Sequence, residues 1–187
     1  KIIYIFITIT IIPAGYLFVD SLPKKFDLTS VENFEYKIPA NLIDVHRQFI
    51  WGFSISKFKD KPIFGYGPDT SNYIEDGQKI IGLQRTGDMN FIPSHPHNFV
   101  VELLLETGIF GTSLFLILIF VINSKIWNLN KTMKFRLYLI FFNSYFWASS
   151  LVNFSFWLGW WQASYFLLLS LIASKAVIDK TEKKIII

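Results

Sequence analysis

The sequence predicts an all-α, polytopic integral membrane protein with a large extracytoplasmic loop between two transmembrane helices. The first observation is composition, because 52% of the 187 residues are hydrophobic and 18% are aromatic, more than a soluble domain of this size usually carries. The second is that the apolar residues gather into four segments, and a membrane-spanning helix needs ~20 of them. The third is a long segment of mixed charge that separates the first two.

These segments divide the chain into six parts. The first helix contains Pro13 and Gly15, and membrane helices tolerate such a kink. The chain starts at Lys1 without the features of a signal peptide, so we expect the C-terminal part of a longer polytopic protein. The predicted parts are a transmembrane helix at 1–19, an extracytoplasmic loop at 20–96, a transmembrane helix at 97–123, a cytoplasmic loop at 124–136, two transmembrane helices within 137–174 and a cytoplasmic tail at 175–187.

The orientation follows from the distribution of positive charge in the short connections. The segment 124–136 holds four basic residues and no acidic one, and the segment after Ser174 is rich in lysine. Both should be cytoplasmic by the positive-inside rule. Four alternating spans then place residues 20–96 on the outer side of the membrane.

The outer loop contains one predicted helix and one predicted turn. Apolar residues recur at helical spacing at Leu42, Val45, Phe49 and Phe53, so we expect an amphipathic helix lying on the membrane surface or on other helices. The following stretch "KPIFGYGPD" is rich in proline and glycine, which is typical of a turn.

A polar, titratable cluster stands at the start of the second span, in "SHPHNF". Pro96 suits the first position of a helix, which would place His97 and Asn98 in the first turn. The free N–H groups and the dipole there favour an anion such as phosphate, and the same field would keep His97 neutral. A neutral histidine beside an anion site is a candidate general base.

Two other interpretations of this cluster stay open. A polar group at a helix end can be only a cap. A metal site could instead combine His95 and His97 with His46 or Glu102, although no established ligand spacing supports it and our prediction is that no metal is bound.

Two carboxylates follow on the same helical face, at Glu102 and Glu106. Carboxylates in membrane spans are often functional, but these would also fit the headgroup depth, where they would simply be solvated. For Glu102 the two interpretations are balanced, and for Glu106 we favour solvation. Gly108 and Gly111 would let another helix approach closely.

Two arginines in the outer loop are candidates for binding a phosphate. Arg47 lies on the predicted amphipathic helix, where its guanidinium could form paired hydrogen bonds with a phosphate or merely reach to the surface. Arg85, in "GLQRTGD", is a weaker candidate. The chain has no cysteine, which excludes thiolate chemistry, and its lysines form no basic stripe for nucleic acid.

At this point the sequence resembles a known family. "HNFVVELLLETGIFGT" fits the pattern H-[NSQ]-x9-G-x-x-G-T of bacterial O-antigen ligases, with His97, Asn98, Gly108, Gly111 and Thr112 at its fixed positions. Upstream, "RQFIW" and "KPIFGYGPD" resemble the arginine and P-x-x-G-x-G stretches of the O-antigen ligase and polymerase superfamily. Where these ligases often have R-x-x-x-L, Trp51 takes the place of the leucine. The resemblance covers roughly residues 42–122.

The resemblance implies a glycosyltransferase of the bacterial inner membrane that needs no cofactor or metal. The donor would be a glycan on undecaprenyl pyrophosphate, and the acceptor a sugar hydroxyl on lipid A–core, at the outer face of the membrane. His97 would be the general base. Arg47, with Asn98 and Arg85, would bind the pyrophosphate, and Glu102, His95, Gly108 and Gly111 would support the site.

Two alternatives to a ligase remain. A polymerase of the same superfamily would use another repeat unit as acceptor. A transporter domain is less favoured, because transporters place ionisable residues near the bilayer midplane, whereas here they gather at one interface. Family members usually have about a dozen spans, so we expect this chain to be inactive alone.

Overall fold

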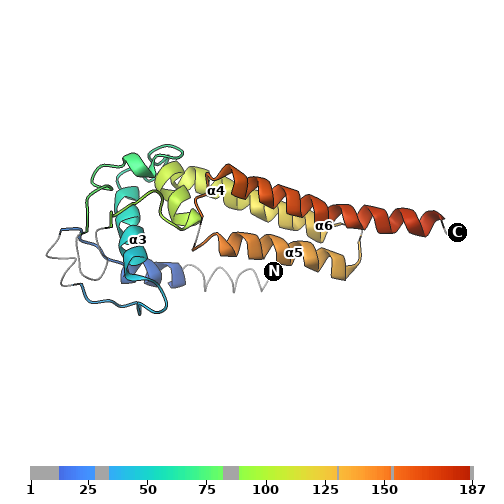
Figure 1. Ribbon diagram of the computed structural model, residues 1–187, viewed down its shortest axis with the longest axis horizontal. Helices are drawn as coiled ribbons and strands as arrows, with labels where there is room; N and C mark the ends of the chain where they lie inside the picture. Colours follow the sequence, from blue (N-terminus) through green and yellow to red (C-terminus); the bar gives the residue numbers. More distant parts are fainter. Residues whose placement is uncertain (1–12, 28–33, 82–88, 130, 153, 186–187) are drawn as a thin grey trace.

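The computed structural model describes residues 13–27, 34–81, 89–129, 131–152 and 154–185. Within these ranges the regular structure is helical, apart from an isolated β-bridge between Ile80 and Asn90. Three long helices lie side by side, and a shorter helix crosses one end of them (Figure 1). The predicted all-helical character is therefore confirmed for the described residues.

The three long helices are α4 (Phe99–Trp127), α5 (Met133–Ser149) and α6 (Gly159–Ile185). They alternate in direction, so that the α5–α6 connection returns to the end of the bundle where α4 begins (Figure 1). A polar chain joins them: the Asn143 amide donates to Asn123 Oδ1 at 2.9 Å, and the Tyr165 hydroxyl donates to Asn143 Oδ1 at 2.5 Å. Such interhelical hydrogen bonds fix helix pairing where apolar burial provides little discrimination.

The boundaries differ from those expected. α4 begins two residues later than predicted, at Phe99, and continues to Trp127, while α6 continues through the expected tail to Ile185. Among the described residues, α4 is long and apolar enough to cross a membrane by length and composition, with a mean hydropathy of 2.2. Within the most apolar stretch of this helix, 22% of the residues are buried inside the protein, so most of the stretch is not covered by the rest of the described chain.

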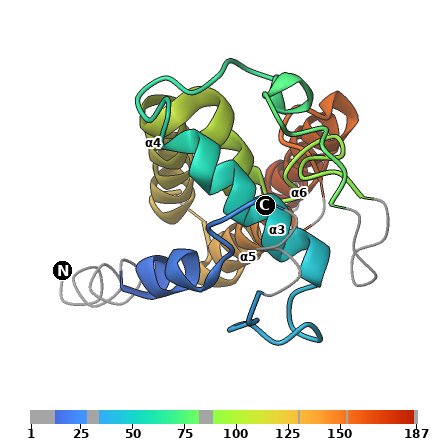
Figure 2. The ribbon, with the colours of Figure 1, turned by 90° about the vertical axis from the view of Figure 1, so that its left-hand side faces the viewer.

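The crossing helix is α3 (Val45–Phe58), which begins after the N-cap Asp44. The Asp44 carboxylate accepts from the backbone N–H of His46 at 2.9 Å. Figure 2, which looks onto the end of the bundle, shows α3 lying across it. Leu42, expected in the apolar stripe of this helix, precedes it and is 75% exposed.

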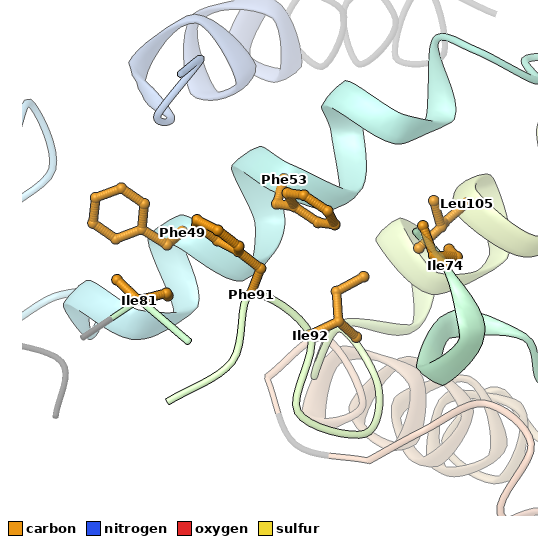
Figure 3. Packing of buried hydrophobic residues seen from close by; sticks show 7 residues of the cluster. All are labelled: Phe49, Phe53, Ile74, Ile81, Phe91, Ile92 and Leu105. Carbon is orange, nitrogen blue, oxygen red and sulfur yellow. The ribbon is translucent and has the colours of Figure 1, made fainter. Parts of the chain in front are cut away.

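At this end of the helical bundle, buried apolar side chains pack on both sides of α3. On one side the buried cluster contains Phe49, Phe53, Ile74, Ile81, Phe91, Ile92 and Leu105 (Figure 3). On the other side the buried cluster contains Leu22, Ile50, Trp51 and Val101. Each such side chain contributes about 1.5–3 kcal/mol on burial. α3 therefore packs against α4 and the surrounding loops as a core helix, the second of the two placements expected for it.

Candidate functional site

The helix α4 is interrupted at Gly108, and the turn 62–67 is hydrogen-bonded into the interruption. Gly108 has φ 65° and ψ −168°, which lies outside helical space. Beyond it, the N–H of Ile109 donates to the Pro62 carbonyl at 2.8 Å, and that of Phe110 to Ile63 at 3.1 Å.

The turn also donates to α4. Before the interruption, the N–H groups of Tyr66 and Gly67 donate to the carbonyls of Leu105 and Glu106, at 3.0 and 2.8 Å. These four hydrogen bonds supply partners for the carbonyls of Leu105 and Glu106 and for the N–H groups of Ile109 and Phe110. The two stretches that carried the family resemblance, P-x-x-G-x-G and G-x-x-G-T, form one unit.

One glycine in each stretch, Gly65 and Gly108, is required by this close approach. A Cβ on Gly108 would lie 2.2 Å from the Ile63 carbonyl oxygen, and one on Gly65, at φ 68°, would lie 2.4 Å from the carbonyl carbon of Glu106. The expectation that Gly108 admits a neighbouring helix is wrong. Gly108 admits the backbone of the turn, and Gly111 makes room for the Thr107 side chain of its own helix.

Glu106 fixes the next part of the loop. Its Oε1 accepts from the backbone N–H of Ser71 at 2.9 Å and from the Ser71 hydroxyl at 2.5 Å. Its Oε2 accepts from the N–H of Asp69 at 2.7 Å and from the indole N–H of Trp157. The side chain is buried, with 1% exposed, so the expected solvated carboxylate is wrong.

Glu102, one turn earlier, holds the α5–α6 connection. Its two oxygens accept from the Ser155 hydroxyl at 2.5 Å and from the N–H of Phe156 at 2.6 Å. It is as buried as Glu106. The two carboxylates thus join α4 to two loops distant in sequence, and neither is solvated at headgroup depth.

The histidine turn precedes α4 rather than opening it. Asn98 is the N-cap, and its Oδ1 accepts from the N–H of Val100 at 3.0 Å and of Val101 at 3.1 Å. His97 was expected in the first helical turn, but it lies before the helix. The interpretation of the polar cluster as a helix cap holds for Asn98. Two of the N–H groups expected to attract an anion are already satisfied.

His97 adopts φ 54°, a left-handed conformation that is uncommon for residues other than glycine. Non-glycine residues held there cluster at functional sites. The rings of His95 and His97 lie 4.1 Å apart between centroids, and the Ser94 hydroxyl is 2.9 Å from His95 Nδ1. The turn thus presents two adjacent imidazoles in a fixed arrangement.

Trp51 connects this turn to α3. Its indole N–H donates to the Pro96 carbonyl at 2.8 Å, and the side chain is 3% exposed. Residues four apart on a helix are neighbours on one face, so Arg47 lies one helical turn before Trp51 on the same face of α3. Arg47 is half-buried.

The other expected site residues lie elsewhere. Arg85 falls outside the described residues. His46 Nε2 is 2.8 Å from the Asn90 carbonyl oxygen, and Glu102 is engaged by the α5–α6 connection. In the part of the chain that the structure describes, no group of three or more histidine and carboxylate side chains is arranged to hold a metal ion.

Sequence reasoning assigned no structural role to four residues that build this end of the molecule: Trp51, Ser71, Ser155 and Trp157. Trp51 had a usable signal, because it stands one helical turn after Arg47. The other three meet Glu102 or Glu106 across 35 to 53 residues, and no local pattern reports such a contact.

Comparison with known proteins identifies relatives of this architecture. A family model described as O-antigen ligase matches residues 1–116. A curated protein of Rickettsia prowazekii (strain Madrid E), named as a proposed polysaccharide ligase, is 34% identical over 160 residues, which cover 84% of this chain and 38% of that protein. A similarly named protein of Rickettsia typhi (strain Wilmington) is 33% identical over 166 residues, covering 88% of this chain and 40% of the relative.

The chain spans about two fifths of the length of these curated relatives. No solved structure matches it. Because the family model covers more than half of this chain and the relatives are about one-third identical to it over the aligned residues, this chain belongs to the O-antigen ligase family.

Proposed function

We propose that the full-length protein transfers a glycan from undecaprenyl pyrophosphate to a sugar hydroxyl such as that of lipid A–core, at the outer face of the bacterial inner membrane. His97 acts as the general base and Arg47 binds the pyrophosphate. The hydrogen bond from Trp51 to the Pro96 carbonyl, 2.8 Å long, carries this proposal, because it joins the helix of Arg47 to the turn of His97.

The proposed reaction needs both a base, His97, and a cation that stabilises the leaving group, Arg47. The acceptor oxygen attacks the anomeric carbon while its proton passes to the imidazole, and the bond to the pyrophosphate oxygen breaks. Negative charge then grows on the leaving group, where a guanidinium stabilises it through two parallel hydrogen bonds. A base within hydrogen-bond reach contributes roughly 10²–10⁴-fold to the rate.

A second feature supports a lipid-linked donor. A pocket of about 420 Å³ lies between α4, α5 and α6 and is lined mainly by aromatic and aliphatic side chains, among them Phe115, Trp147 and Tyr165. Phe99, directly after the cap Asn98, contacts both Phe115 and Trp147, with ring centroids 5.7 and 5.6 Å apart. We assign this pocket to part of the isoprenoid chain, whose pyrophosphate would lie towards the histidine turn.

The test compares the two neighbouring histidines in the full-length protein. We expect His97→Ala to abolish glycan transfer in purified membranes supplied with the lipid-linked glycan, while the protein remains in the membrane. His95→Ala is the matched control and should retain most activity. Equal loss from both substitutions, restored by added zinc, would favour a metal site instead.

The acceptor separates a ligase from a polymerase. The names of the relatives refer to polysaccharide ligases, which favours the ligase. In a strain lacking the full-length gene, we expect polymerised glycan to remain on its lipid carrier, as seen by gel separation of the surface glycan. Single repeat units attached to the final acceptor would instead identify a polymerase.

A further inference from the structure

The turn inserted at the break of α4 exposes large apolar side chains. Ile63 is 61% exposed and Phe64 is 70% exposed, and beside them Ile109 and Phe110 are each 55% exposed. The rings of Phe64 and Phe110 lie 5.6 Å apart between centroids. These four residues, 63, 64, 109 and 110, form one apolar patch that we call the wedge.

The backbone holds the wedge in place. The carbonyls of Pro62 and Ile63 accept from the N–H groups of Ile109 and Phe110, and the Gly65 N–H donates to the Lys61 carbonyl at 3.0 Å. Gly65 and Gly108 have no room for a side chain. The exposed side chains therefore cannot withdraw into the protein without breaking these contacts, and a rigid exposed apolar patch marks a surface that something covers.

The wedge is continuous with the outward face of α4. Phe110 is followed at helical spacing by Leu114, Ile117 and Val121, which are 53%, 56% and 38% exposed. α4 is the described helix that meets the length and composition of a membrane span. The wedge thus extends the apolar surface of that helix toward the end at which it begins.

The segment Lys59-Asp60-Lys61 links α3 to the wedge and carries a net positive charge. All three residues are exposed, and Lys61 Nζ lies 4.5 Å from the Tyr66 ring centroid. Lys57, by contrast, is paired with Asp76 at 3.7 Å. Lysines beside an apolar surface are suited to the headgroup phosphates of a bilayer, with their aliphatic parts against the acyl boundary.

We propose that the wedge inserts into the outer leaflet of the lipid bilayer, with Lys59 and Lys61 at the level of the headgroup phosphates. It sets the depth of the α4 break, and with it the depth of the histidine turn, whose His97 stands eleven residues before Gly108. The inference concerns a contact with lipid and does not depend on the glycan-transfer activity.

The test uses the full-length protein, freed of other cysteines and reconstituted in nanodiscs. Phe64→Cys is labelled with an environment-sensitive fluorophore, and Ile63→Cys serves as a second probe. Quenching is compared between lipids brominated near the top of the acyl chain and aqueous iodide. Glu35→Cys, at an exposed charged position of the outer loop, is the aqueous control.

We expect the label at residue 64 to emit at shorter wavelength than the label at residue 35, to be quenched by brominated lipid, and to be protected from iodide. Quenching by lipid should increase with the fraction of anionic lipid, and the double substitution Lys59→Gln and Lys61→Gln should remove that dependence. Iodide quenching equal to that of the control would overturn the proposal. Protection from both quenchers would also overturn it, because protein rather than lipid would then cover the wedge.

Discussion

At the scale of single residues, the start of α4 separates two roles that neighbour each other in sequence. Asn98 caps the helix through Val100 and Val101, while His97 is left outside it at φ 54°. The cap therefore determines where the helix begins and, by doing so, determines the conformation of the histidine. The candidate base owes its placement to its neighbour and to Trp51, which holds the Pro96 carbonyl.

Substitutions at Asn98 should reveal the capping role. Serine is also a good N-cap, so Asn98→Ser should change the stability little, whereas Asn98→Ala should lower it by about 0.5–2 kcal/mol. Thermal unfolding of the full-length protein in detergent measures both. If Asn98→Ser destabilised the protein as much as Asn98→Ala, the cap would not be its main contribution.

The rate of glycan transfer should depend on the shape of the charged group at position 47. Arg47→Lys keeps the charge but loses the planar, bidentate geometry that suits a pyrophosphate. A charged hydrogen bond contributes ~1.5–3 kcal/mol, so we expect transfer to fall by about tenfold to hundredfold. Rates measured with the lipid-linked donor check this, and near-normal activity would remove Arg47 from the site.

At the scale of elements, the break in α4 and the turn 62–67 form one structural unit. Four backbone hydrogen bonds link them, to the carbonyls of Leu105, Glu106, Pro62 and Ile63. Earlier in the same helix, Glu102 attaches the α5–α6 connection and Glu106 attaches the 69–71 loop. This end of the molecule is thus held by polar contacts as well as by the aromatic core.

The break should tolerate no side chain at Gly108. In Gly108→Ala the new Cβ would meet the Ile63 carbonyl oxygen at 2.2 Å, and alanine would be held at a positive φ, which costs about 1–3 kcal/mol before the clash is counted. Gly159→Ala, where a Cβ meets nothing within 4 Å, is the matched control. Thermal unfolding should show a large loss for the first and almost none for the second.

The two carboxylates should respond differently to conversion into an amide. At Glu106 both oxygens accept from backbone N–H groups, of Ser71 and Asp69, so a glutamine must turn its NH₂ toward one of them. An unsatisfied buried donor costs about 1–3 kcal/mol.

At Glu102 one partner is the Ser155 hydroxyl, which can accept as well as donate. Glu102→Gln should therefore be nearly neutral in thermal unfolding, while Glu106→Gln should be clearly destabilised. Equal losses would mean that the negative charge, rather than the hydrogen-bonding pattern, stabilises this region.

At the scale of the whole molecule, the three long helices place the loops at two opposite ends. α3, the histidine turn and the α5–α6 connection share one end, and the α4–α5 connection lies at the other (Figure 1). With α4 in a bilayer, these ends would lie on opposite sides of it. The basic residues of 124–136 favour the cytoplasm for the second end.

Cysteine labelling tests this orientation. In a cysteine-free background of the full-length protein, Asn72→Cys should react with an impermeant thiol reagent in intact cells, whereas Asn128→Cys should react only after the membrane is opened. Both positions are exposed, so the accessibility of the side chain does not limit either reaction. The reverse pattern would place the histidine turn in the cytoplasm.

The sequence by itself determined the helical class, the position of the long apolar segments and the family, because these depend on composition, local periodicity and the fixed spacing from His97 to Thr112. It also located Arg47 and His97 as candidates. Only the tertiary structure decided that Gly108 accepts a turn rather than a helix, that Glu102 and Glu106 are buried acceptors, and that Trp51 joins α3 to the histidine turn. The physical reason is the same in each case: the partners are hydrogen-bond donors and acceptors that are distant in sequence, and a local pattern contains no information about which of them will meet.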